Sequence, residues 1–301
     1  MDDIVTRIPM QSLNGNPIKS VEFSRWTCAE LAEQDFPIEY LIEDFLVAGQ
    51  PAIIAGPKKC LKTTTIVAAA IALATGTPLF GRFAVLKPQR VLMMTAESGM
   101  ATMKETISRI AATQDIALKA IANLIVSDMV PKLANDEHLR GLERMLDDDG
   151  IGVLFVDPAY MAMPGTDPAN GFTAYDVLSR VSRLCGDRSV TLVLAHHTRK
   201  SASSTTAPPD LDDIAWAGYG EWARQWILLG RRERYTPGSG QHRLWLTVGG
   251  SAGHSGEWAL DVNEGPYRRG AARQWSVSLQ EADEARSQRA AERVENKSKI
   301  S

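Results

Sequence analysis

A lysine and a threonine stand six and seven residues after a glycine in the stretch GPKKCLKTTT, residues 56–65. This spacing matches the phosphate-loop (Walker A) motif G-x-x-x-x-G-K-[ST]. In such a loop the backbone N–H groups surround phosphate oxygens at a helix N-terminus. The lysine reaches the β- and γ-phosphates, and the hydroxyl binds Mg²⁺. The spacing therefore predicts a nucleotide-binding segment made of Gly56, Pro57, Lys58, Lys59, Cys60, Leu61, Lys62, Thr63 and Thr64.

Leu61 is the one departure from the motif, because it stands at the position of the second glycine. The backbone there approaches the ligand closely and can need a conformation that only glycine adopts freely. A leucine held in such a conformation costs on the order of 1–3 kcal/mol. The alternative interpretation is a basic turn that caps an ordinary helix. The context favours a phosphate loop, since an apolar strand-like segment precedes it and a helical pattern follows it.

Two acidic residues end apolar segments further along the chain. Glu97 ends RVLMMTAE, residues 90–97, where a carboxylate can polarise the water that attacks a γ-phosphate. Asp157 ends IGVLFVD, residues 151–157, in the pattern of a Walker B strand, whose aspartate holds Mg²⁺ through its water shell. Taken alone, each also fits a plainer interpretation: a solvent-facing glutamate at a strand end, and an Asp-Pro turn.

Two adjacent histidines, His196 and His197, end the apolar segment SVTLVLAHH, residues 189–197. A polar residue at this position can sense the γ-phosphate and transmit its presence to the loop that follows. Neighbouring residues of a strand point to opposite faces, which argues against a metal site made by the pair.

Strand-like and helical segments alternate through most of the chain. Further apolar segments of strand length lie at 124–128 and 225–231, and helical patterns lie at 62–76, 98–112, 135–149 and 174–187. This alternation predicts an α/β fold with a mostly parallel sheet covered by helices on both faces. Short aromatic segments bounded by glycine, at 242–250, 256–262 and 273–279, predict antiparallel strands that extend one edge of that sheet.

Composition limits the partners. The 301 residues carry a formal net charge of -3, so no global basic field attracts nucleic acid or membranes, and any nucleic-acid contact must come from a local patch. Three widely spaced cysteines, a polar N-terminus and the short apolar runs lead us to expect a cytoplasmic protein without a membrane partner.

The ordered set GPKKCLKTTT, TAESG, LFVDP, LAHHTRK and GYGEWARQWILLGR resembles the RecA-like ATPases of the RepA type, over roughly residues 36–232. These are hexameric replicative helicases of plasmids and mobile elements, with AAA-labelled relatives in phage and bacterial genomes. The resemblance implies a RecA-like P-loop core and a homo-hexameric ring with ATP bound between subunits. We accordingly expect an N-terminal arm with a short helix at 1–35, an ATPase domain at 36–280, and a charged tail at 281–301 that is a frayed helix or disordered.

The resemblance also implies a role for each site residue. Lys62 and Thr63 bind the phosphates and Mg²⁺, Glu97 is the catalytic carboxylate, and Asp157 is the Walker B acid. Of the two histidines we favour His196 as the γ-phosphate sensor. Arg224 aligns with the arginine finger that reaches a neighbour's site, with Arg231 and Arg232 as competitors for that role.

Single-stranded DNA is the partner that the resemblance implies. The loops after Asp157 and after the histidines would face the channel of the ring, and the second carries Arg199 and Lys200. Six copies would multiply this small basic patch into a ring of positive charge. The alternative is a surface loop with two incidental cations. A primase or initiator would be a separate chain, because no primase segment is recognisable.

The leading hypothesis is thus an ATP-hydrolysing motor on single-stranded DNA, either a helicase or a helicase loader. A regulatory ATPase that switches partners without translocating is the second hypothesis. A nucleotide-binding scaffold with a degenerate loop is the third.

Overall fold

The computed structural model describes residues 25–163, 171–199, 206–216, 218–269 and 273–298. The chain divides into two compact units, Met1–Pro37 and Ile38–Ser301. The described part of the first unit contains helix α1, Cys28–Glu33. It opens with a capping box between Thr27 and Glu30, and a short helix in this arm is what the sequence predicts.

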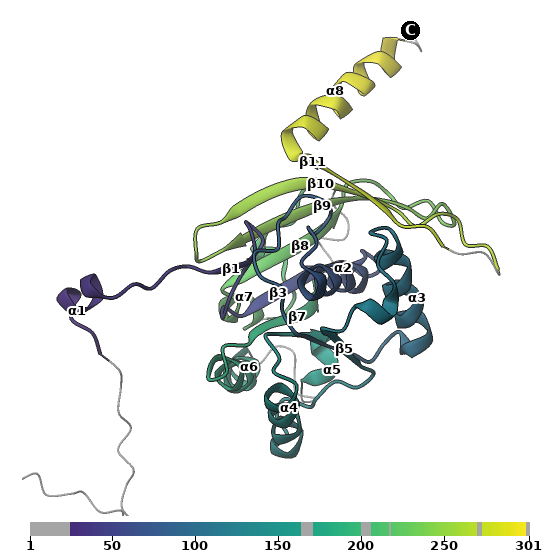
Figure 1. Ribbon diagram of the computed structural model, residues 1–301. Helices are drawn as coiled ribbons and strands as arrows, with labels where there is room; N and C mark the ends of the chain where they lie inside the picture. Colours follow the sequence, from purple (N-terminus) through teal and green to yellow (C-terminus); the bar gives the residue numbers. More distant parts are fainter. Residues whose placement is uncertain (1–24, 164–170, 200–205, 217, 270–272, 299–301) are drawn as a thin grey trace, which may run out of the picture. The chain divides into compact units, whose positions relative to one another are not determined.

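A nine-stranded sheet with the order β11-β10-β9-β8-β3-β7-β6-β4-β5 forms the centre of the second unit (Figure 1). The six strands from β8 to β5 are parallel, and β9, β10 and β11 extend the β8 edge with antiparallel pairing. The predicted fold class, an α/β RecA-like core with added antiparallel strands, is confirmed. The strands are β3 (Ala52–Gly56), β4 (Val91–Thr95), β5 (Leu124–Ser127), β6 (Val153–Asp157), β7 (Thr191–His197), β8 (Gln225–Arg231), β9 (Gln241–Gly250), β10 (Ser255–Asn263) and β11 (Ser276–Glu281).

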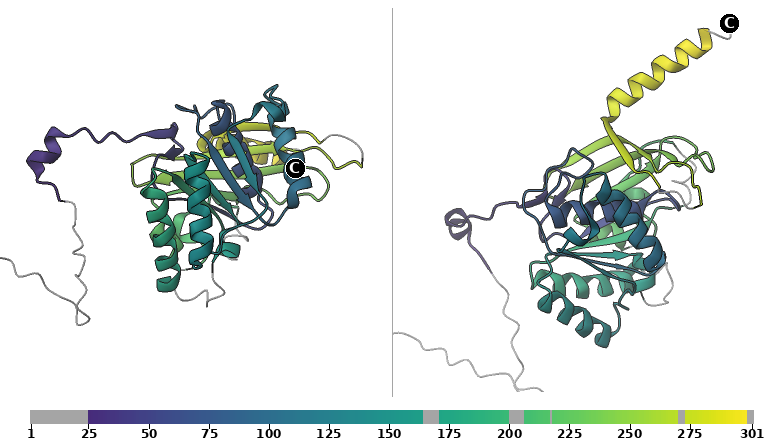
Figure 2. Two further views of the ribbon diagram at one scale, coloured as in Figure 1. Left: turned by 60° about the horizontal axis from the view of Figure 1, so that its bottom comes forward. Right: turned by 45° about the vertical axis from the view of Figure 1, so that its right-hand side comes forward.

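Helices cover both faces of the parallel part of the sheet (Figure 2). On one face of the sheet, α2 and α3 pack against strand residues such as Ile54 and Met93. On the opposite face, α4 and α6 pack against Ile53 and Leu92, the preceding residues of the same strands. Alternate residues of a strand face opposite sides, so a strand buried on both faces must be apolar throughout. The helices of this unit are α2 (Lys62–Thr75), α3 (Gly99–Ala112), α4 (Asp136–Asp148), α5 (Ala159–Ala162), α6 (Gly171–Gly186), α7 (Tyr219–Trp222) and α8 (Ala282–Ser298), with 3₁₀ turns at Leu118–Ala120 and Leu211–Asp213.

The antiparallel strands pack over the same helices as the parallel ones. Leu246 of β9 and Trp258 of β10 belong to the core that contains α2 and α3. The charged tail continues from β11 into helix α8, whose Ala282 and Ala285 pack on Trp245 and Ala259. Of the two alternatives for the tail, the described residues thus adopt a helix, and it belongs to the same compact unit as the sheet.

A small antiparallel sheet of β1 (Tyr40–Ile42) and β2 (Leu46–Val47) precedes the core and was not predicted from the sequence. The buried Gln225 attaches it to the start of β8. Its side-chain amide donates to the carbonyls of Val47 and Gln50 and accepts from the Val47 N–H. None of the helices in the described part of the chain is long and apolar enough to cross a membrane.

Candidate nucleotide-binding site

The phosphate loop connects β3 to α2 at the carboxyl edge of the parallel sheet. A Cβ atom on Gly56 would lie 2.7 Å from the carbonyl oxygen of Leu229 in β8, so only glycine allows this approach of the two strands. Leu61 has φ 58° and ψ 24°, and Lys59 has φ 59°. Leu61 therefore has the left-handed conformation that made glycine the expected residue. Its partly buried side chain packs against the core that contains α2, which offsets part of the strain.

The side chains of the loop differ in their access to a ligand. Lys58 and Lys59 are exposed, whereas Cys60 is buried, and burial raises the pKa of its thiol to about 11. Cys60 can therefore contribute to a bound phosphate through its backbone rather than through its side chain. The first N–H groups of α2 lack intrahelical acceptors, as at any helix start, and so are available to an anion.

Lys62 lies folded back on its own loop. Its Nζ donates to the carbonyls of Gly56 and Pro57, both at 2.9 Å, and lies 3.2 Å from Nδ1 of His197. Burial lowers the pKa of this lysine. The two carbonyls hold the ammonium group at the place from which it can reach the outer phosphates of a nucleotide.

Thr63 and Asp157 meet across the site. The Thr63 hydroxyl donates to Oδ2 of Asp157 at 2.6 Å, and Asp157 is 4% exposed. Burial raises the pKa of this carboxyl, and the hydrogen bond from Thr63 opposes that shift. A hydroxyl beside a buried carboxylate is a donor set that suits Mg²⁺, which prefers oxygen ligands and keeps several waters. The residues predicted to hold Mg²⁺ thus lie together and fit that ion.

Glu97 follows β4 and is exposed, and the backbone joins it to the Walker B strand because the Ala96 N–H donates to the carbonyl of Asp157. Its Oε1 accepts a hydrogen bond from the hydroxyl of Tyr160, a residue of α5 that the sequence analysis did not identify. This bond is the main cause that raises the pKa of Tyr160 to about 12. The candidate catalytic carboxylate is therefore engaged by a tyrosine that lies three residues after Asp157.

The two histidines face opposite ways at the end of β7. His197 lies beside Lys62, and burial followed by the charge of that lysine lowers its pKa. His196 is 2% exposed, stacks on Tyr219 with ring centroids 4.0 Å apart, and has its Nε2 2.9 Å from the carbonyl of Ala215. The sequence favoured His196 as the phosphate sensor, whereas the geometry brings His197 to the phosphate loop.

The three candidate arginines occupy different surroundings. Arg224 is exposed at the amino end of β8, the edge of the sheet opposite the phosphate loop. Arg231, at the carboxyl end of β8, donates to the carbonyls of Lys58 and Lys59 at 3.2 and 2.8 Å. Arg232 is buried and paired with Asp261. Of these three arginines, only Arg224 is both exposed and far from the phosphate loop of its own chain.

Of the two residues predicted to contact nucleic acid, Arg199 is among the described residues and Lys200 is not. Arg199 is exposed directly after β7, and its backbone N–H and Nε donate to the carbonyls of Asp213 and Ile214. Lys200 and residues 164–170 of the other predicted channel loop lie outside the described residues. Trp216, 41% exposed, follows close by and contacts the ring of His196. Trp216 is not among the residues predicted from the sequence, although it follows the second predicted loop in the chain.

A family model described as an AAA domain matches residues 18–203. The match spans more than half of the chain and contains the phosphate loop, Glu97, Asp157 and both histidines. A comparison with curated proteins finds no match.

Proposed function

The chain belongs to the AAA domain family of P-loop ATPases, and we propose that it is an ATP-hydrolysing motor that acts on single-stranded DNA. One observation carries the proposal. Lys62, Thr63, Asp157 and Glu97 come from three separate strand ends and converge at one edge of the sheet. Ligands of open α/β sheets bind at this carboxyl edge.

Each residue of the site has a distinct task in hydrolysis. Lys62 would leave the loop carbonyls to bind the outer phosphates of ATP, and Thr63 and Asp157 would hold Mg²⁺. Bound Mg²⁺ neutralises charge on the phosphate oxygens. Glu97 accepts the proton of the water that attacks the γ-phosphate, and His197 contacts the phosphate that is lost.

Tyr160 makes this hydrolysis conditional. While the Tyr160 hydroxyl donates to Oε1 of Glu97, that oxygen is occupied and the carboxylate is a weaker base towards water. Tyr160 belongs to the segment AYMAMPGTDPANGF, residues 159–172, one of the two loops expected to meet DNA. We therefore propose that DNA at this loop draws Tyr160 away and releases Glu97.

The strand that contacts the phosphate loop also leads to the second DNA loop. His197 faces Lys62 while His196 packs on Tyr219 and Trp216, so a shift at the end of β7 moves both sides together. Arg199 and the exposed Trp216 supply the cation and the flat ring that proteins use to bind single-stranded nucleic acid.

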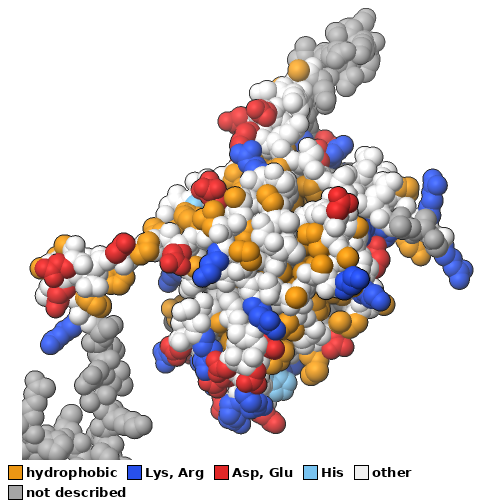
Figure 3. Space-filling model, viewed as in Figure 1, with side chains coloured by type: hydrophobic (Ala, Val, Ile, Leu, Met, Phe, Trp, Pro, Cys, Tyr) orange, Lys and Arg blue, Asp and Glu red, His pale blue; other side chains and the backbone are white. Residues whose placement is uncertain are grey.

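Charge favours a ring over a single subunit as the DNA-binding form. The net charge is -3, and on the face shown in Figure 3 basic and acidic side chains are interspersed rather than gathered. A hexamer would bring six copies of Arg199 and Lys200 to one channel. It would also place the exposed Arg224 of one subunit beside the phosphates of the next, where such an arginine stabilises the transition state.

Mixed rings test this arrangement. When assayed alone, Arg224→Ala should lose at least about tenfold and Lys62→Ala at least about a hundredfold in ATP turnover. In a mixture, a subunit with intact Arg224 meets one with an intact phosphate loop, so part of the turnover returns. If the mixture is no more active than its components, Arg224 does not act in a neighbouring site.

A regulatory ATPase that switches partners is the second candidate function. The bond from Tyr160 to Glu97 favours it too, because a hydrolysis rate held low in the resting state suits a switch. Turnover that responds to a protein partner and not to DNA would distinguish this function from the motor.

A further inference from the structure

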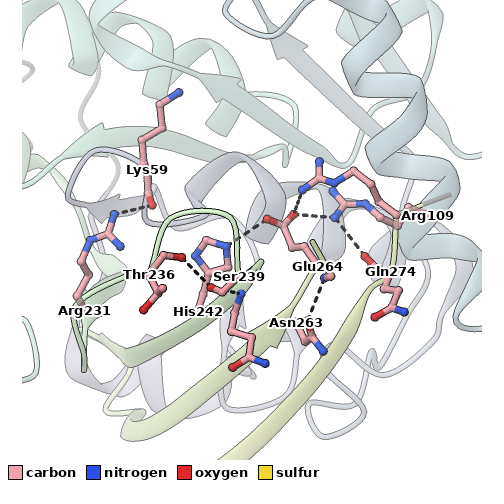
Figure 4. Close-up of polar contacts among 12 residues, drawn as sticks. Lys59, Arg109, Arg231, Thr236, Ser239, His242, Asn263, Glu264 and Gln274 are labelled. Atoms are coloured by element: carbon pink, nitrogen blue, oxygen red, sulfur yellow. Dashed lines mark hydrogen bonds and ion pairs between the residues drawn. The ribbon is translucent and has the colours of Figure 1, made fainter. Parts of the chain in front are cut away.

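A cavity of about 420 Å³ lies beside the phosphate loop, in the connection between β8 and β9. Figure 4 shows Arg231 at one end of this region, donating to Lys59, and His242 and Glu264 further along. The volume falls in the range of small-molecule sites. The cavity is lined by Arg231, Glu233, Arg234, Tyr235, Thr236, Ser239, Gln241, His242, Arg243 and Leu244.

An aromatic ring forms a flat surface in this cavity. Tyr235 stacks on His242 with ring centroids 4.8 Å apart and planes 17° apart. The guanidinium carbon of Arg231 lies 6.0 Å from the centroid of the Tyr235 ring. A planar heterocycle that stacks on the tyrosine requires the flexible Arg231 side chain to move outward from this position.

The flat surface is held from behind by a buried network. His242 Nε2 lies 3.2 Å from Glu264, which binds Arg109 of α3 at 2.6 Å and Arg273 at 3.1 Å. Burial alone would raise the pKa of Glu264, but these three partners lower it to about 2. The network fixes His242 and hence the orientation of Tyr235.

The charges that line the cavity are mixed. Arg231 is used by the loop carbonyls and Arg243 pairs with Asp261 at 2.7 Å, whereas Arg234 is exposed. Glu233 adds a negative charge to the lining. A ligand that offers a flat ring fits this surface better than one that offers only phosphates.

The position of the cavity relative to the phosphate loop indicates that the flat ring is the base of a nucleotide. Lys62, Asp157 and His197, which define the outer-phosphate end of the site, lie towards β7 and β6. The strand β8 lies on the other side of β3, so a nucleotide whose outer phosphates lie towards β7 can extend its nucleoside towards β8 and β9. Arg231 belongs to both places, since it contacts the phosphate loop and lines the cavity.

We propose that this cavity binds the base of the nucleotide whose phosphates occupy the loop, with Tyr235 as the stacking surface. The inference rests on the proposed function, because it requires a nucleotide at the phosphate loop. It adds residues far along the chain, at 231–244, to a site that the motifs limit to residues 56–197.

Calorimetric titration of the full chain tests the proposal with two probes, a non-hydrolysable ATP analogue and inorganic triphosphate. Tyr235→Ala should weaken the analogue about tenfold and leave triphosphate unchanged, because only the analogue has a base to stack. Tyr235→Phe, which keeps the ring, should bind the analogue like the wild type. Tyr267→Ala is the matched control, since Tyr267 is 77% exposed and outside the cavity.

Three results would overturn the inference. Unchanged analogue binding by Tyr235→Ala would remove the base from this cavity, and an equal loss for both probes would mean that Tyr235 only supports the loop. Weaker binding of single-stranded DNA by Tyr235→Ala, with the analogue unaffected, would assign the cavity to nucleic acid. A wild-type protein that binds neither probe would instead contradict the proposed function itself.

Discussion

Leu61 holds a left-handed backbone at the start of α2, a conformation that costs an L-residue about 1–2 kcal/mol relative to glycine. Packing offsets part of this strain, since the Leu61 side chain lies against the core. Leu61 thus adopts the left-handed conformation that a glycine would adopt at this position of the loop. Nothing in this geometry removes Lys62 or Thr63 from the site.

Two substitutions at Leu61 should separate strain from packing. Leu61→Ala and Leu61→Gly lose nearly the same packing, but only glycine relieves the strain, so the glycine variant should be more stable by about 1 kcal/mol in urea unfolding. Ala101→Gly on the exposed side of α3 is the control and should destabilise by about 0.5–1 kcal/mol. A glycine variant less stable than the alanine variant would show that Leu61 is unstrained.

His196 gives a pH dependence to stability. Burial lowers its pKa from an ordinary 6.5 to about 4. The unfolded chain takes up a proton near pH 6.5 and the folded chain only near pH 4. The contribution of this group is therefore fully present above about pH 6.5 and is lost as pH falls towards 4.

His196→Phe, which keeps a ring on Tyr219, should remove this part of the pH dependence. Between pH 7.5 and pH 5 the wild type should lose about 2 kcal/mol more unfolding free energy than the variant, measured by urea titration at both values. Equal losses in the two proteins would mean that His196 does not titrate as its burial requires.

At the scale of elements, the ends of β3, β4, β6 and β7 meet because parallel strands present their carboxyl ends at one edge. Helix α5 begins immediately after β6 and places Tyr160 on Glu97. A residue of the helix that follows one strand thus hydrogen-bonds to the carboxylate that follows another.

Tyr160→Phe should raise ATP turnover in the absence of DNA several-fold and reduce its stimulation by DNA, because Glu97 loses its resting partner. Glu97→Gln should keep nucleotide binding and lose turnover in the presence or absence of Tyr160. Steady-state phosphate release measures both. A Tyr160→Phe protein with wild-type turnover and stimulation would exclude the release of Glu97 as the controlling step.

The sequence predicts what depends on local pattern. The phosphate loop, the apolar strands that precede Glu97 and end at Asp157, and the antiparallel extension follow from spacing and periodicity. Features that depend on tertiary placement were not predicted. Which histidine faces Lys62 depends on the pleat of β7, and the bond between Tyr160 and Glu97 joins residues 63 apart. The two-residue strand β2 is too short to show a period.

At the scale of the molecule, the positions along β8 separate the roles of its arginines. Arg231 donates to the carbonyls of its own phosphate loop, whereas Arg224 lies at the opposite end of the strand, so the proposed finger role of Arg224 involves a neighbouring subunit. The proposed ring also fits the net charge of -3, because repeating one small basic patch gathers positive charge without a basic chain.

The proposed DNA-dependent motor can be tested by steady-state ATP hydrolysis of the full chain, with and without single-stranded DNA and beside Lys62→Ala. We expect turnover that rises with DNA and falls at least about a hundredfold in Lys62→Ala, since the lysine acts on the transferred phosphate. Turnover that is equal in the variant, or that is indifferent to DNA, would rule out a DNA-dependent motor at this loop.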